Sequence, residues 1–144
     1  MLDANILVYA VEANALQHAS SRALIEAARD PATILYLTSQ TLCEFYSIVT
    51  NPRRVAAPRS PAEALHAISA FLALPGIRVL PTPARTVVGW MALLRRHPVT
   101  GGDVFDLQLA ATMQANDIQR IYTFNTEDFE VFPELTVIAP PEGA

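Results

Sequence analysis

The amino-acid sequence predicts an α/β domain in which a short central parallel β-sheet is flanked by helices on both faces. Short runs rich in β-branched residues alternate with longer stretches whose apolar residues recur at helical spacing. The chain has 144 residues, 51% of them hydrophobic, which suits one buried core in a single domain covering residues 1–144. Because strands separated by helices favour parallel pairing, functional groups are expected beyond the carboxyl ends of the strands.

The first half of the chain is expected to contain helices on either side of one strand. Residues 5–13 (NILVYAVEA) are apolar and indicate either a short helix or a strand that continues into one. Residues 15–29 and 41–50 carry apolar side chains at helical spacing, and each pattern is followed by a proline that ends it. Residues 33–37 (TILYL), between these helices, form a compact β-run bounded by polar residues.

The second half continues the alternation of helices and strands. Ser60, Pro61 and Glu63 predict a helix start, with a capping residue, a proline in the first turn and an acid at the third position. That helix ends before Pro75. The remaining expected elements are a strand at 77–80 (IRVL), helices at 83–96 and 103–116, and strands at 120–123 (RIYT) and 135–138 (LTVI).

The overall composition excludes several classes of protein. The chain has 14 acidic and 10 basic residues, all of the latter arginine, so it lacks the basic surface of a sequence-reading DNA-binding domain. Its single cysteine, Cys43, excludes an internal disulfide and a structural zinc site. No apolar stretch approaches the ~20 residues of a membrane span, and the N-terminus lacks the basic region of a signal peptide. A cytoplasmic protein without a membrane partner is therefore expected.

Acidic and amide side chains follow the expected strands from four separate segments. They are Asp3 and Asn5 after residues 1–2, Glu44 early in helix 41–50, Asp103 and Asp106 at the start of helix 103–116, and Asn125 and Asp128 after strand 120–123. Carboxylates gathered without basic partners repel one another, and oxygen-binding ions such as Mg²⁺ or Mn²⁺ relieve that repulsion. One or two such ions can activate water and neutralise charge on a phosphodiester. This pattern favours metal-dependent hydrolysis.

Four segments, in this order along the chain, carry a family resemblance: MLDANILVYA, SQTLCEFYSIVTNP, GGDVFDLQLAATM and IYTFNTEDFEVFPELTVI. They resemble the successive motifs of the PIN-domain ribonucleases, and above all the VapC-type toxins of bacterial toxin–antitoxin pairs. Each motif is weak alone, and the likeness runs from residue 1 to about residue 138. The resemblance implies a PIN-like fold and cleavage of RNA with Mg²⁺ or Mn²⁺ as cofactor, one or two ions. It also implies a homodimer that is sequestered by a small VapB-like antitoxin.

The resemblance also assigns roles to single residues. It implies that the catalytic residues are Asp3, Glu44, Asp106 and Asn125, that the metal ligands are Asp3, Glu44, Asp106 and Asp128 with Asp103 as an extra candidate, and that Asn5 and Thr123 are polar supports. Many family members have Asp where this chain has Asn125, which leaves open whether one metal or two would bind. Only Met1 and Leu2 precede Asp3, so either the first strand is very short or the start codon lies upstream.

Several alternatives stand beside these assignments. Asp103 can serve simply as a helix cap after two glycines. Arg53, Arg54 and Arg59 form either a solvated loop or contacts to RNA phosphates. An aspartyl-phosphate phosphatase is disfavoured, because the chain has D-A-N rather than D-x-D and contains no lysine. A non-catalytic PIN-like protein-binding module and a housekeeping PIN nuclease without antitoxin remain as alternative functions.

Overall fold

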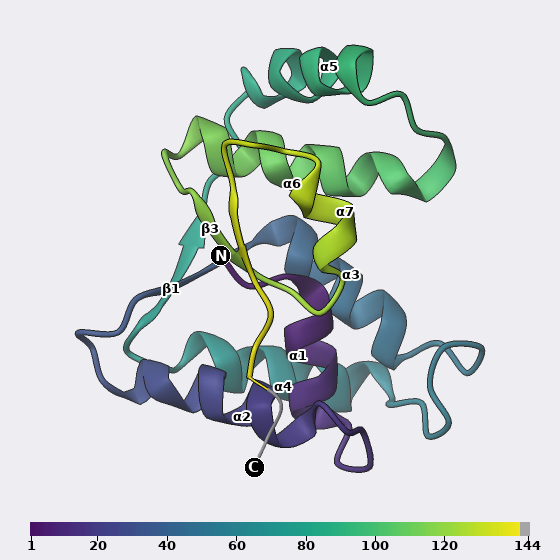
Figure 1. Cartoon of the computed structure of the whole chain (residues 1–144). Helices are drawn as coiled ribbons and strands as arrows, with labels where there is room; N and C mark the ends of the chain where they lie inside the picture. The colour runs from purple at the N-terminus through teal and green to yellow at the C-terminus, as the bar shows by residue number, and fades with distance from the viewer. Residues whose placement is uncertain (142–144) are drawn as a thin grey trace.

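Two parallel strand pairs form the sheet of the computed structural model, which describes residues 1–141 (Figure 1). β1 (Leu35–Thr38) pairs with β2 (Ile77–Leu80), and β3 (Arg120–Tyr122) pairs with β4 (Thr136–Ile138). These strands occupy the four runs that the sequence predicts, and their ends differ from the prediction by at most two residues. The expected α/β fold with parallel strands is therefore confirmed.

The N-terminal residues join the two strand pairs into one sheet. The Leu2 N–H donates to the Tyr36 carbonyl of β1 at 2.9 Å, and Leu2 forms a parallel bridge with Tyr122 of β3. The Tyr122 N–H donates to the Met1 carbonyl at 2.9 Å, and the Asp3 N–H donates to the Tyr122 carbonyl at 3.0 Å. The order across the sheet is therefore β2, β1, the N-terminal residues, β3 and β4.

Helices fill the connections at the positions that the sequence predicts. They are α1 (Ala4–Val11), α2 (His18–Glu26), α3 (Ser39–Val49), α4 (Pro61–Leu72), α5 (Thr86–Arg96), α6 (Val104–Ala115) and α7 (Thr126–Glu130), with 3-10 turns η1 (Ala27–Arg29) and η2 (Gly101–Asp103). The segment with two readings, residues 5–13, is helical as far as Val11. α7 was not predicted, because its five residues are too few to show a periodic apolar pattern. Within residues 1–141, no helix has the length and apolar character needed to cross a membrane.

Successive strand residues alternate between two cores on opposite faces of the sheet. Leu35 and Leu37 of β1 belong to the core shared with α1, α2, α3 and α4, whereas Tyr36 packs against the core of α5, α6 and α7. Leu2 lies in the first core and Met1 in the second. Figure 1 shows the two helix groups on opposite sides of the strands, so the prediction of helices on both faces is confirmed.

Reciprocal side-chain caps begin the two helices α3 and α4. The Thr41 N–H donates to Thr38 Oγ1 at 3.1 Å, while the Thr38 N–H donates to Thr41 Oγ1 at 3.0 Å. At α4, the Glu63 N–H donates to Ser60 Oγ at 3.2 Å and the Ser60 N–H donates to Glu63 Oε2 at 3.0 Å. These caps satisfy N–H groups that the first turn leaves free, and they confirm the predicted start at Ser60. The first cap also fixes the exit from β1 into the helix that carries Glu44.

Gly76 provides a test of the close approach between β2 and its neighbours. A Cβ atom there would lie 1.9 Å from the Thr33 carbonyl oxygen and 3.0 Å from the Ala28 backbone. We expect Gly76→Ala to lower the free energy of unfolding by about 1–3 kcal/mol, measured by urea denaturation. Gly102→Ala is the matched control, since its Cβ would meet nothing nearer than Phe105 at 4.0 Å. Equal stability of the two variants would contradict this account of Gly76.

Candidate active site

Asp3 is a buried carboxylate held by three hydrogen bonds at the N-terminus of α1. Its Oδ1 accepts from the Ala4 N–H at 2.8 Å, and its Oδ2 accepts from Thr123 Oγ1 at 2.8 Å and from Asn5 Nδ2 at 3.3 Å. The side chain caps α1, where a negative charge also complements the helix dipole. Burial nevertheless raises the pKa of Asp3, because desolvation outweighs these hydrogen bonds.

Thr123 links the end of β3 to this carboxylate. Its hydroxyl donates to Asp3 and accepts from Asn5 Nδ2 at 3.1 Å and from the Asn125 N–H at 3.0 Å. The Phe124 N–H donates to Asn5 Oδ1 at 3.4 Å. Asn5 and Thr123 therefore lie where polar supports of Asp3 would have to lie, and the Asn125 backbone is fixed by the same hydroxyl.

Glu44 is held by a residue that sequence reasoning missed, Gln40. Gln40 Nε2 donates to Glu44 Oε1 at 2.7 Å and to the Phe105 carbonyl at 2.7 Å. Because Phe105 directly precedes Asp106, this amide connects α3 to the start of α6. The only signal in the sequence is the spacing of four residues between Gln40 and Glu44, which places both on one helix face.

Asp106 has the most perturbed carboxyl group of the site. Desolvation is the largest cause, followed in order by the charges of Asp128, Asp3, Glu44 and Asp103, and together they raise the pKa of Asp106 to about 7. The pKa of Glu44 is raised as well, mainly by burial. Within residues 1–141, no ion pair joins an arginine to Asp3, Glu44 or Asp106. The site therefore gathers negative charge without neutralising it.

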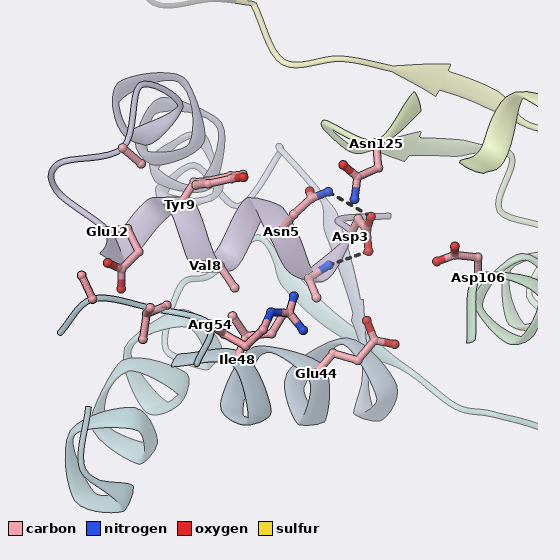
Figure 2. Close-up of a pocket in the computed structure, with 14 residues that line it drawn as sticks. Asp3, Asn5, Val8, Tyr9, Glu12, Glu44, Ile48, Arg54, Asp106 and Asn125 are labelled. Atoms are coloured by element: carbon pink, nitrogen blue, oxygen red, sulfur yellow. Dashed lines mark hydrogen bonds between the residues drawn. The ribbon is translucent and has the colours of Figure 1, made fainter. Parts of the chain in front are cut away.

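One cavity of about 450 Å³ brings most of the predicted site residues together (Figure 2). The predicted residues that line it are Asp3, Asn5, Glu44, Asp106, Asn125 and Arg54. A second, smaller cavity of about 170 Å³ is lined by Asp103, Asp106 and Asp128. Asp106 thus lines both cavities, and Asp103 and Asp128 lie on the side of the smaller one. In the part of the chain that the structure describes, no three His, Cys, Asp or Glu side chains are already arranged to hold a metal ion.

The three arginines of the loop after α3 have different environments. Arg54 lines the larger cavity, and its guanidinium points toward the carboxylates (Figure 2). Arg59 forms an ion pair with Glu12 and donates to the Val11 carbonyl, which ties the loop to the end of α1. Arg53 is exposed. The sequence cluster therefore separates into one arginine at the site, one tied to α1 and one at the surface.

Comparison with known proteins identifies the family. The family model of the PIN domain matches residues 1–135. The chain belongs to the PIN domain family. It is 34% identical over 116 residues to the VapC ribonuclease Mb2897 of Mycobacterium bovis and to ribonuclease VapC43 of Mycobacterium tuberculosis, covering 81% of this chain and 79% of each relative. The resemblance to VapC-type PIN domains drawn from the four motifs is thereby confirmed.

Solved structures share the fold of this PIN domain. The crystal structure of Mycobacterium tuberculosis VapC20, a toxin that cleaves the sarcin–ricin loop, matches with a TM-score of 0.68 at 19% identity over 91% of this chain and 93% of that one. A chain of VapBC2 from Rickettsia felis, bound to a DNA fragment from its promoter, matches with a TM-score of 0.68 at 20% identity over 96% of both chains. These likenesses confirm the predicted PIN-like fold.

The side chains of the PIN-domain site fit a hard divalent cation. The groups that line the cavity beside Asp3 supply carboxylate and amide oxygens, which Mg²⁺ and Mn²⁺ prefer, and no sulfur or imidazole. Burial first, and then the charges of neighbouring carboxylates, raise the pKa of Asp3, Glu44 and Asp106, so ionising these groups carries a penalty. A bound cation removes that penalty, which is the reason for treating these residues as candidate ligands.

The raised pKa of Asp106 predicts a pH dependence of stability in the metal-free protein. Because the folded pKa of about 7 exceeds the ordinary aspartate value of 3.8, the folded state retains a proton that the unfolded chain has lost. Stability therefore falls as the pH rises from about 4 to about 7 and stays low above that range. We expect Asp106→Asn to flatten this fall and to unfold at a higher temperature than the parent at pH 8, measured with a chelator present. Glu130→Gln, at an exposed position, is the control and should follow the parent; a parental pH profile in Asp106→Asn would contradict the assignment.

Proposed function

We propose that this PIN domain is a metal-dependent endoribonuclease, the toxin of a VapBC-type toxin–antitoxin pair. The observation that carries the proposal is the gathering of Asp3, Glu44 and Asp106, from three separate elements, around one cavity, where within residues 1–141 no arginine forms an ion pair with them. The identity to ribonucleases of the VapC family supports RNA as the substrate. Mg²⁺ or Mn²⁺ is the cofactor that the oxygen-only ligand set favours.

The proposed ligands are Asp3, Glu44 and Asp106, with Asp128 and Asp103 available to Asp106 from the second cavity. One or two bound ions supply activation of water and neutralisation of charge on the phosphodiester. Thr123 and Asn5 orient Asp3 through hydrogen bonds, and Gln40 orients Glu44. The neutral Asn125 side chain contributes an amide at the cavity rim in place of a fourth carboxylate, so a second ion would depend on Asp128.

The proposed partners follow from the family. VapBC2 of Rickettsia felis is a complex, and we propose a small VapB-like antitoxin, a homodimer and a cytoplasmic location for this chain as well. A short reading frame immediately upstream, whose product abolishes cleavage on co-expression, would separate a toxin from a housekeeping PIN nuclease. A non-catalytic binding module is favoured only by Asn125, and the two experiments below separate it from an enzyme.

Cleavage of RNA depends on the carboxylates in this proposal. We expect Asp3→Asn and Asp106→Asn to reduce the initial rate of RNA cleavage in Mg²⁺ or Mn²⁺ by more than about 100-fold, because loss of a ligand removes several kcal/mol of transition-state stabilisation. Circular dichroism and gel filtration check that the variants are folded. Glu130→Gln keeps the parental rate. Parental cleavage by either folded site variant would refute the assignment of that residue.

Metal binding has a readout that does not require cleavage. A ligand that binds only the folded state raises its stability, by about 2.7 kcal/mol at 100 times its dissociation constant. We therefore expect excess MnCl₂ or MgCl₂ to raise the melting temperature of the parent and of Glu130→Gln, and to have a much smaller effect on Asp106→Asn. If neither salt shifts the parent, the protein-binding module becomes the better interpretation.

A further inference from the structure

The cavity beside Asp3 extends well past the carboxylates, along the groove between α1 and α3. Beyond Asp3 and Glu44, its walls are made by Val8 and Tyr9 of α1, Ile48 of α3, and the loop residues Val55 and Ala56. Figure 2 shows Asp3, Glu44 and Asp106 at one end of this space and Glu12 at the other, with Val8, Tyr9 and Ile48 between them. One space therefore has an end with three carboxylates and an end, here called the apolar end, where apolar side chains surround the single carboxylate of Glu12, which is paired with Arg59. The chemistry proposed above uses only the first end.

Arg54 lies between the two ends. It is the basic residue that lines this cavity, and within residues 1–141 its guanidinium has no ion pair and no hydrogen bond to the protein. An arginine beside three carboxylates that binds none of them is free to bind an anion from outside. Its planar group with several N–H donors suits a phosphate oxygen pair better than a point charge does.

Two contacts hold the far end of the cavity together. Glu12 lines it and is held by the ion pair with Arg59, which joins α1 to the loop after α3. Tyr9 packs edge-on against Phe124, with ring centroids 5.3 Å apart, so its ring is fixed at the wall. A preformed end with an aromatic ring and aliphatic side chains suits a flat ring with polar edges.

We propose that the apolar end of this cavity binds the base of one nucleotide next to the cleaved bond, while Arg54 binds a phosphate of the same strand. This inference rests on the proposed function. The base must leave its helical partner to enter the cavity, so the substrate is a single-stranded or looped segment of RNA. Charge complementarity supports RNA in this cavity, because Arg54 and the metal ions bound by the carboxylates would place positive charge on either side of the RNA phosphate backbone.

The first test measures RNA binding without cleavage. The probe is a short fluorescein-labelled single-stranded RNA, with Ca²⁺ in place of Mg²⁺ because Ca²⁺ takes the same oxygen ligands in a looser geometry. We expect Arg54→Ala to raise the dissociation constant about tenfold and Arg54→Lys to raise it less. Arg95→Ala, which removes the same charge from an exposed position on α5, keeps parental affinity. The same RNA annealed to its complement binds more weakly to the parent.

The second test locates the base with the unaltered protein, so it does not depend on any variant folding. Single abasic nucleotides are placed along a cleavable RNA, and cleavage is followed in Mn²⁺. We expect an abasic nucleotide on one side of the cleaved bond to raise KM about tenfold, with little effect elsewhere. Ala56→Trp, which narrows the apolar end, should raise KM for the intact RNA and remove the abasic effect.

The outcomes separate this inference from the proposed function. A parent that cleaves RNA but shows a flat abasic scan, together with parental binding by Arg54→Ala, overturns the base site and leaves the nuclease intact. A parent that cleaves no RNA in Mg²⁺ or Mn²⁺ overturns the proposed function itself. Equal binding of single-stranded and duplex RNA would also contradict a base held inside the cavity.

Discussion

The burial of the Asp3 carboxylate at the centre of the sheet is the constraint on which the rest of the site depends. The backbone before it joins the two strand pairs, and the same residue caps α1. The carboxylate of a residue that is only 7% exposed must be hydrogen-bonded, and Thr123, Asn5 and Ala4 provide those bonds. The element that completes the sheet thus also places a functional group at the carboxyl edge of β3.

The buried carboxylates repel one another and are poorly solvated, and a bound cation would relieve both costs. Burial raises the pKa of Asp3, Glu44 and Asp106, and no arginine relieves it within the described residues. The four acids Asp3, Glu44, Asp106 and Asp128 equal in number the excess of acids over arginines in the chain. The acidic charge of the cavity therefore belongs to the metal-free protein. A bound cation would convert a cavity that repels phosphate into one that attracts it.

Local signals in the sequence were sufficient where short-range physics decides the outcome. The caps at Ser60 and the proline-bounded helices could be predicted because they depend on neighbouring residues. α7 could not, since five residues show no periodicity. The hydrogen bond of Gln40 to Phe105 and the ion pair of Arg59 with Glu12 could not be predicted either, because these partners are distant in the chain.

The sequence by itself determined the class of fold, the order of the elements and the identity of the acidic and amide groups, because strand composition, helical spacing and motif order are local properties. Only the tertiary structure decided which of those groups share a space. It placed Asp3, Glu44 and Asp106 around one cavity, put Asp128 on the far side of Asp106, and pointed Arg54 inward while tying Arg59 to α1. These outcomes depend on how distant segments pack across the sheet and on which side chains lose water when they do.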